Sequence, residues 1–174
     1  MKKHLKQLFL VSLTIISLFL SSCHVSRRVG PGHSSDKTEH YHISEKNKRG
    51  KKVIEEALKW EGTPYKYAGS DRKTGTDCSG MVMSVYLDAT GIKLPRNSAK
   101  QAEYCKKISS SKVETGDLCF FATGKDPKKI SHVGIMIDEE NFIHASTSKG
   151  VVISKITTPY YTRTFIQFGR VPSE

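Results

Sequence analysis

The sequence predicts an α+β domain in which early helices pack on an antiparallel sheet of about five to six strands. Apolar residues recur at helical spacing up to about residue 104, and short β-branched or aromatic runs separated by turn residues follow. Helices followed by strands, rather than alternating with them, are typical of this class. The chain has 174 residues, 37% of them hydrophobic, which suits one such domain with a modest core.

The first residues predict export. Three lysines precede an apolar stretch at 8–20: Lys2, Lys3 and Lys6. That stretch is shorter than the roughly 20 apolar residues of a spanning helix and suits a signal peptide. Leu20-Ser21-Ser22-Cys23 resembles the bacterial lipobox, which implies that residues 1–22 are a lipoprotein signal peptide and that Cys23 is lipidated. An ordinary signal peptide and a retained anchor helix are the alternatives.

Residues 23–50 are polar, with Gly-Pro-Gly, paired serines and no apolar period. We interpret them as a flexible tether from Cys23 that spans roughly 30 Å. Its histidines include the pair His40 and His42, whose spacing also occurs in metal sites, but solvated side chains are the simpler interpretation.

The charge of the chain is spread unevenly. The net charge is +11, but residues 51–174 hold 19 Lys and Arg against 14 Asp and Glu, a net of +5. A mildly basic domain with scattered bases argues against nucleic-acid binding. Attraction to an anionic substrate is compatible with it.

Three helices are expected. Residues 51–61 carry apolar side chains at helical spacing and stop before Gly62. Asp77 is a good N-cap and Gly91 a good C-terminal stop for a second helix, whose apolar residues extend almost all round, so that it is central and buried. A third helix starts at Ser98, where Ser98-x-x-Gln101 matches a capping box.

Five strands are expected after these helices. They cover residues 118–122, 132–137, 141–146, 151–156 and 165–171. A short acidic turn joins the second and third of them, so these two form a hairpin.

The cysteines suggest one reactive thiol. After Cys23, three remain, and Cys105 and Cys119 are candidates either for free buried thiols or for a disulfide bridge. Cys78 follows the expected N-cap Asp77, and at a helix N-terminus the free N–H groups and the helix dipole lower a thiol pKa toward the nucleophilic thiolate. Ser79 and Gly80 are small, which leaves room for a substrate, and backbone N–H groups of Cys78 or Ser79 can donate to an oxyanion.

The two histidines of residues 51–174, His132 and His144, lie on the two strands of the hairpin. If its turn has an odd number of residues, both imidazoles point to one face. A turn centred on Asp138 places them directly opposite each other, and one centred on Glu139 makes them diagonal neighbours. A thiol at a helix start with a histidine pair on one sheet face is the layout of a cysteine peptidase.

Several sequence blocks occur together and in order. They are Gly62-Thr63-Pro64-Tyr65-Lys66-Tyr67-Ala68-Gly69, Asp77-Cys78-Ser79-Gly80, Leu94-Pro95-Arg96, Thr115-Gly116-Asp117-Leu118, His132-Val133-Gly134-Ile135 and Phe142-Ile143-His144-Ala145-Ser146. Over about residues 51–171 the chain thereby resembles the NlpC (NlpC/p-sixty) family of bacterial cell-wall cysteine peptidases, which have a papain-like fold. Single-domain murein endopeptidase lipoproteins of Gram-negative bacteria look most similar.

This resemblance implies the site. Cys78 is the nucleophile, His132 the general base and acid, and His144 orients His132. Tyr65 lies near the thiolate and helps to hold the oxyanion or substrate, unless it only anchors its loop. Ser79 and Arg96 are candidate substrate-binding residues, and the alternative for Arg96 is a solvated loop charge. A thiol–imidazole mechanism needs no metal and no cofactor. Ala68 departs from the family pattern, which commonly has Gly there, and we expect a negative φ at this position.

The resemblance also implies the substrate and the place of action. Peptidoglycan stem peptides are the substrate class, with the D-Ala–diaminopimelate cross-link favoured over the γ-D-Glu–diaminopimelate bond. We expect a monomer, lipid-anchored and facing the cell wall, at the periplasmic side of the outer membrane in a Gram-negative bacterium. A non-catalytic peptidoglycan-binding module and a related amidase or acyltransferase are the alternatives.

Overall fold

The computed structural model describes residue 41 and residues 47–173. The predicted signal peptide, the lipidation site at Cys23 and nearly all of the predicted tether lie outside the described residues. Within the described part, no helix combines the length and the apolar character needed to cross a membrane.

Helices precede most of the strands, as the sequence predicts. The helices are α2 (Lys48–Leu58), α3 (Cys78–Thr90), α4 (Ser98–Tyr104) and α5 (Pro159–Thr164), with the 3-10 helix η2 (Ser110–Lys112). The strands are β1 (Ser70–Asp71), β2 (Gly75–Thr76), β3 (Lys106–Ile108), β4 (Leu118–Phe121), β5 (His132–Met136), β6 (Asn141–Ser146), β7 (Gly150–Lys155) and β8 (Phe165–Arg170). The five predicted strands correspond to β4–β8.

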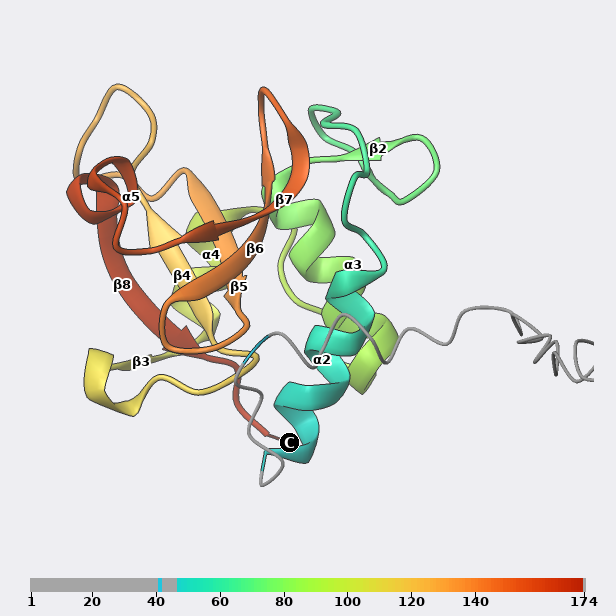
Figure 1. The fold of residues 1–174 in the computed structure, drawn as a ribbon, viewed down its shortest axis with the longest axis horizontal. Helices are drawn as coiled ribbons and strands as arrows, with labels where there is room; N and C mark the ends of the chain where they lie inside the picture. Colours follow the sequence, from blue (N-terminus) through green and yellow to red (C-terminus); the bar gives the residue numbers. More distant parts are fainter. Residues whose placement is uncertain (1–40, 42–46, 174) are drawn as a thin grey trace, which may run out of the picture. The chain divides into compact units, whose positions relative to one another are not determined.

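The main sheet has six strands in the order β3-β8-β4-β5-β6-β7, and every pairing is antiparallel. From β4 to β7 the chain forms neighbouring hairpins, but β8 returns to lie between β3 and β4. Figure 1 shows α2 and α3 on one side of this sheet and α5 at the start of β8, away from its arrowhead. The predicted α+β class is confirmed.

Two clusters of side chains cover the two faces of the sheet. The larger joins α2 and α3 to inward residues of β4, β5 and β6, among them Phe120 and Ile135. The smaller lies on the opposite face and consists of Cys119, Phe121, Met136, Phe142 and Phe168. Burial on both faces explains why β4 is a continuous apolar run and why β5 has no polar side chain after His132.

Helix α3 is the predicted central helix. Seven residues of its N-terminal two-thirds are buried: Cys78, Ser79, Gly80, Met81, Val82, Val85 and Tyr86. Asp77 caps it, and Gly91 closes it at φ +78°, both as predicted. The helix therefore holds Cys78 at a fixed place against the sheet.

Of the other two predicted helices, α2 differs at both ends, whereas α4 begins at Ser98 as predicted but has another cap. Helix α2 begins at Lys48, with Asn47 as N-cap, earlier than the predicted residue 51 and within the predicted tether, and it ends at Leu58. Helix α4 is capped by Asn97, whose side chain accepts from the N–H of Lys100, not by Ser98. The capping box is wrong because Gln101 does not turn back to the cap: its amide donates to the carbonyl oxygens of Ser79 and Pro95.

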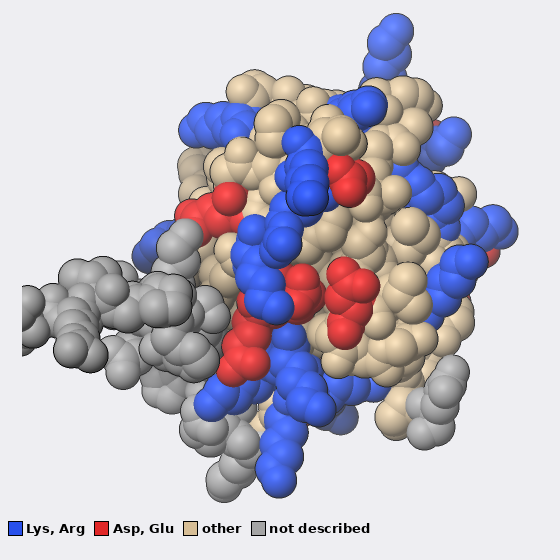
Figure 2. Space-filling model, turned by 90° about the vertical axis from the view of Figure 1, so that its right-hand side faces the viewer, with Lys and Arg blue, Asp and Glu red and all other residues tan. Residues whose placement is uncertain are grey.

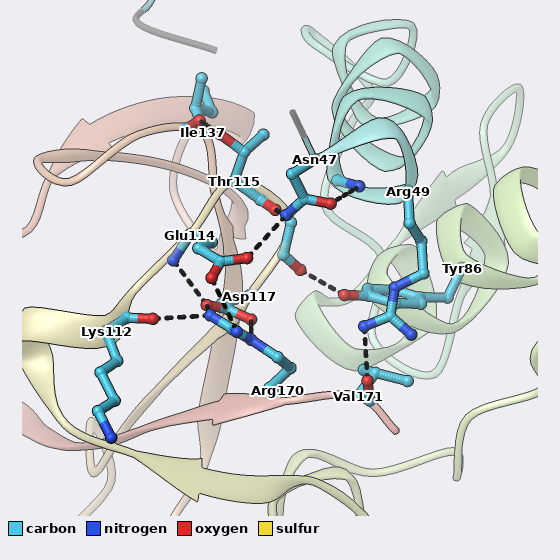
Figure 3. Close-up of polar contacts among 12 residues, drawn as sticks. Asn47, Arg49, Tyr86, Lys112, Glu114, Thr115, Asp117, Ile137, Arg170 and Val171 are labelled. Atoms are coloured by element: carbon cyan, nitrogen blue, oxygen red, sulfur yellow. Dashed lines mark hydrogen bonds and ion pairs between the residues drawn. The ribbon is translucent and has the colours of Figure 1, made fainter. Parts of the chain in front are cut away.

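A polar cluster ties the C-terminal strand to the rest of the domain (Figure 3). The Arg170 guanidinium donates to both carboxylate oxygens of Asp117 at 2.8 Å and to Glu114 at 2.9 Å. Asp117 is 4% exposed, and the Tyr86 hydroxyl donates to the carbonyl of the adjacent Gly116. Asp117, from one of the sequence blocks described above, thus anchors β8.

Cys105 and Cys119 are free and buried. They lie in different clusters, Cys105 with the helices and Cys119 on the opposite sheet face, so the sheet separates the two thiols. The alternative of a bridge between them is therefore wrong.

Charges of both signs mix on the surface. Figure 2 shows one face on which Lys and Arg lie next to Asp and Glu instead of forming an uninterrupted basic area. Ion pairs on the surface include Lys100 with Glu103, both exposed, and Lys59 with the half-buried Glu56. Such exposed pairs stabilise the fold by little.

Candidate active site

The first turn of α3 positions Cys78. The Asp77 carboxylate accepts from the Gly80 N–H at 2.7 Å and from the Ser79 hydroxyl at 3.2 Å. A Cβ on Gly80 would stand 2.1 Å from the carbonyl oxygen of Gly69. The space beside Gly80 is therefore filled by the preceding loop and not, as the sequence analysis expected, left for a substrate.

Arg96 holds this helix start. Its guanidinium donates to both carboxylate oxygens of Asp77, at 3.0 and 2.8 Å, to the Ser79 hydroxyl at 3.1 Å and to the Gly69 carbonyl at 3.1 Å. Burial alone raises the pKa of Asp77, but the Arg96 and Gly80 hydrogen bonds outweigh it and the pKa is lowered. Arg96 is thus part of the scaffold around Cys78, and its predicted contact with substrate stays a prediction.

The Cys78 thiol is buried, with 9% of the residue exposed. Burial raises its pKa to about 11, while backbone N–H groups of Val133, Ser79 and Cys78 itself act in the opposite direction. The expected net lowering of the thiol pKa is therefore wrong, because loss of solvent outweighs the helix N-terminus. A thiolate here needs a base close by to receive its proton.

The backbone contact with Val133 places the sulfur beside the first residues of β5. Val133 follows His132 directly, so the strand that supplies the N–H also carries the candidate base. Helix α3 packs against both β5 and β6, the two histidine-bearing strands. The fold therefore brings the start of α3 to the start of β5.

The two histidines are diagonal neighbours. Ile135 pairs with Ile143 and Met136 with Phe142, a register centred on Glu139, which was one of the two predicted alternatives. Nε2 of His132 lies 2.9 Å from Nδ1 of His144. The remaining nitrogen of His132, Nδ1, is thus left to act as a base.

Gly134 makes the diagonal contact possible. In this register it stands opposite His144, and a Cβ there would lie 2.6 Å from Phe142 Cδ2 and 3.2 Å from His144 Cβ. The Phe142 ring stacks on the His144 ring with 4.8 Å between centroids. The Phe142 ring therefore occupies the space beside the glycine and supports His144, whose Nδ1 faces His132.

Burial keeps both imidazoles neutral. His132 is 8% exposed and His144 1%. Loss of solvent lowers the pKa of His132 to about 4, and the same cause followed by the neighbouring His132 lowers that of His144 to about 3. Because little water reaches His132, a proton that moves to it is stabilised by the side chains that face it and not by solvent.

Two hollows flank this arrangement. One of about 330 Å³ is lined by Tyr65, Tyr67, Cys78, Ser79, Arg96 and Ser131, among others. The other, about 580 Å³, reaches His132, His144, Ser146, Ser148, Ser154 and Tyr161. Ser131 borders the first hollow and the next residue, His132, borders the second, so both hollows reach the start of β5.

Tyr65 lies in the Cys78 hollow, as the sequence analysis expects. Burial and then the nearby Cys78 raise the pKa of its phenol, which thus stays protonated as a donor.

The backbone at Ala68, three residues after Tyr65, differs from the prediction. Ala68 has φ +58°, so the expected negative φ is wrong: the loop keeps the left-handed conformation that a glycine would adopt without strain.

Two further polar residues reach the histidine pair and were missed from the sequence. Ser154 and Tyr161 both contact Nε2 of His144. Ser154 interrupts the predicted strand 151–156 with a polar side chain, a signal that could have been followed. Tyr161 carries no such signal because α5 was not predicted. In the described part of the chain, no cluster of three His, Cys, Asp or Glu side chains suits a metal ion.

Comparison with known proteins gives a consistent result. The sequence model described as the NlpC/P60 family matches residues 62–170. A probable endopeptidase of Haemophilus influenzae Rd is 37% identical over 161 residues, which cover 89% of this chain and 92% of the relative. The murein DD-endopeptidase MepS/murein LD-carboxypeptidase of Escherichia coli K12 is 38% identical over 122 residues, 70% of this chain and 63% of the relative.

The fold is found among solved structures as well. A structure of a protein similar to a lipoprotein of the NLP/P60 family, from Staphylococcus aureus Mu50, superposes with a TM-score of 0.66 at 31% identity. The match covers 77% of this chain and 44% of the other.

Proposed function

The chain belongs to the NlpC/P60 family, and from this premise we propose that it is a cysteine endopeptidase that hydrolyses amide bonds in peptidoglycan stem peptides or their cross-links. One observation carries the proposal: a buried cysteine at the start of α3 touches the strand whose first residue, His132, is hydrogen-bonded to His144. Relatives named as endopeptidases support the reaction class.

In the proposed reaction, Nδ1 of His132 takes the proton of the Cys78 thiol, and the sulfur attacks the carbonyl carbon of the scissile amide. The tetrahedral oxyanion receives hydrogen bonds from the first-turn N–H groups of α3 and from the Tyr65 phenol. His132 then gives its proton to the leaving amine as the C–N bond breaks, which leaves a thioester on Cys78. Water, deprotonated by His132, hydrolyses the thioester and restores the thiol.

His144 orients His132 and stabilises its charged form in this scheme. In this scheme Nδ1 of His144, 2.9 Å from Nε2 of His132, accepts the Nε2–H, so that Nδ1 of His132 stays free to accept the thiol proton. A His132→Ala variant should therefore lose more activity than His144→Ala, since one removes the proton carrier and the other its support.

The scissile bond and the anchor are parts of the proposal. We favour the D-Ala–diaminopimelate cross-link, the bond class that the MepS relative's name as a DD-endopeptidase suggests, ahead of the γ-D-Glu–diaminopimelate bond. We further propose lipidation at Cys23 and attachment to the envelope membrane facing the wall. Acyl chains on Cys23 in mass spectra, and their loss in Cys23→Ser with release of the protein from the membrane fraction, test the anchor.

The enzymatic proposal is tested with purified muropeptides. The protein is incubated with cross-linked dimers and with monomers, and the products are identified by mass. Monomers released from dimers indicate cleavage of the D-Ala–diaminopimelate bond, and stems shortened to D-Glu indicate the other bond. Cys78→Ala should yield no product, while Cys105→Ala, which removes a buried thiol elsewhere in the core, should keep the activity of the folded protein.

Hydrolysis by Cys78→Ala would overturn the mechanism. Binding of muropeptides without any product from the wild-type protein would instead favour the non-catalytic binding module. Acyl transfer from another amide or a lipid, with inert muropeptides, would favour the related amidase or acyltransferase.

A further inference from the structure

Two hydroxyl groups meet the outer nitrogen of His144. Its Nε2 lies 3.0 Å from the Tyr161 hydroxyl oxygen and 3.1 Å from Oγ of Ser154. Tyr161 belongs to α5 and Ser154 to β7. The other nitrogen of the His144 ring, Nδ1, faces His132 on β5. Polar contacts thus continue from His132 through His144 to a third layer of side chains.

The protons in this row are constrained by the reaction. When His132 carries a proton on both nitrogens, its Nε2–H points at Nδ1 of His144, which must then be a bare acceptor. The single proton of neutral His144 therefore sits on Nε2 and needs an acceptor of its own. The Tyr161 and Ser154 oxygens are at hydrogen-bond distance for that proton.

The opposite tautomer would impair the base. With its proton on Nδ1, His144 would donate to Nε2 of His132, and the proton of neutral His132 would move to Nδ1. That atom would then be unable to accept the thiol proton. The acceptors around Nε2 of His144 thus influence which nitrogen of His132 carries its proton, although they contact only His144.

Tyr161 is held firmly enough for this task. Its ring makes edge contacts with Phe142 and His144, at 4.8 and 5.4 Å between centroids, and a tilted contact with Phe121 at 5.3 Å. Burial raises the pKa of its hydroxyl, and a hydrogen bond with Ser154 acts in the opposite direction. The phenol consequently remains neutral near pH 7 and keeps an oxygen lone pair for His144.

We propose that Tyr161, assisted by Ser154, is a positioning residue that holds His144 in the tautomer able to accept from His132. The proposal rests on the proposed cysteine-peptidase function of the same site. In this role α5, which is distant from Cys78 in the chain, helps to keep Nδ1 of His132 free to accept the thiol proton. The residues facing His144 are His132 on β5, Phe142 on its own strand, Ser154 on β7 and Tyr161 on α5.

The test compares Tyr161→Phe with Tyr160→Phe in the full chain. Each variant loses one hydroxyl from α5, and each keeps its ring. Tyr161→Phe should lower kcat on cross-linked muropeptides about five- to tenfold, the size expected for one hydrogen bond, with KM unchanged. Tyr160→Phe should match the wild type, and adding Ser154→Ala to Tyr161→Phe should lower kcat further.

Two readouts do not need turnover. Nitrogen-15 NMR of the imidazoles should show His144 protonated on Nε2 in the wild type and a mixture of tautomers in Tyr161→Phe. The rate of Cys78 alkylation by iodoacetamide should fall in Tyr161→Phe across pH 6–8 and stay unchanged in Tyr160→Phe. A merely structural role would lower the melting temperature without moving either readout.

Unchanged tautomers and unchanged alkylation in folded Tyr161→Phe would overturn the inference, as would a wild-type His144 protonated on Nδ1. Failure of the proposed function is seen separately, because wild-type protein would then leave every muropeptide intact. The NMR and alkylation measurements would still decide the role of Tyr161 in that case.

Discussion

Arg96 meets Asp77 through two parallel hydrogen bonds of 3.0 and 2.8 Å, and the same guanidinium reaches Ser79 and Gly69. One side chain thus joins the cap of α3, the residue after Cys78 and the loop before it. The position of the candidate nucleophile therefore depends on a residue that follows α3 in the chain, in the block Leu94-Pro95-Arg96.

Replacing Arg96 should therefore affect stability together with activity. Arg96→Gln removes the two-point contact and should lower the free energy of unfolding by about 1 kcal/mol, a modest value because the pair is partly solvated. It should also lower kcat, since the start of α3 loses its support. Urea denaturation and muropeptide kinetics measure the two effects, with Arg72→Gln in the exposed β1–β2 turn as control. A raised KM with unchanged stability would point to substrate binding instead.

Ala68→Gly should stabilise the protein. Ala68 has φ +58°, a conformation that costs a residue with a Cβ about 1 kcal/mol or more. Glycine removes this strain, although its freer unfolded chain offsets part of the gain, so we expect up to about 1 kcal/mol in the free energy of unfolding. Ala89→Gly in α3 should do the reverse. A destabilised Ala68→Gly variant would show that the loop is not strained there.

Acid should weaken the fold through the histidine pair. The folded-state pKa values of about 4 for His132 and about 3 for His144 lie below the ordinary value of 6.5. Between pH 6.5 and 4 the unfolded state binds more protons, so stability is present above this window and is lost as the pH falls through it. From pH 7 to pH 5 the pair should contribute a loss of roughly 2 to 4 kcal/mol.

Urea denaturation at both pH values measures this loss. A double variant, His132→Gln with His144→Gln, should be less sensitive to acid than the wild type over the same range. Equal sensitivity would mean that other groups cause the acid effect.

The three described thiols should react at different rates. Cys78 borders an open hollow. Burial raises the pKa of Cys105 to about 12, and Cys119 is fully buried. Iodoacetamide should therefore modify Cys78 in the folded protein and the other two only after unfolding. Peptide mapping by mass spectrometry distinguishes the sites. Equally fast modification of Cys119 would show that the sheet opens readily.

Most of the fold follows from periodicity in the sequence, because α2, α3 and the strands β4 to β8 are long enough to show it. Short elements carry too little pattern: β3 has three residues, and α5 has six, beginning with a proline. An odd turn also places His132 and His144 on one face of the sheet, and turns centred on Asp138 and on Glu139 give the two predicted registers. The pairing of Ile135 with Ile143 between β5 and β6 shows that the turn is centred on Glu139.

The properties that escaped prediction depend on neighbours distant in the chain. The pKa of Cys78 is set by how deeply tertiary packing buries it, which the local helix start does not reveal. The contact of Asp117 with Arg170 spans 53 residues. Tyr161 reaches His144 across 17 residues and from a separate element. Each of these is a consequence of assembly and not of local spacing.

The place of β8 has a consequence for how the chain matures. This strand, residues 165–170, lies between β3 and β4, which precede it by more than forty residues. A ribosome delivers it after the other described strands, so β3 and β4 remain without their shared neighbour until synthesis has reached Arg170. The nascent protein can form its helices and the β4–β7 hairpins early, but β3 joins the sheet only late. Products that stop short of β8 leave β3 without its partner strand and expose one edge of β4.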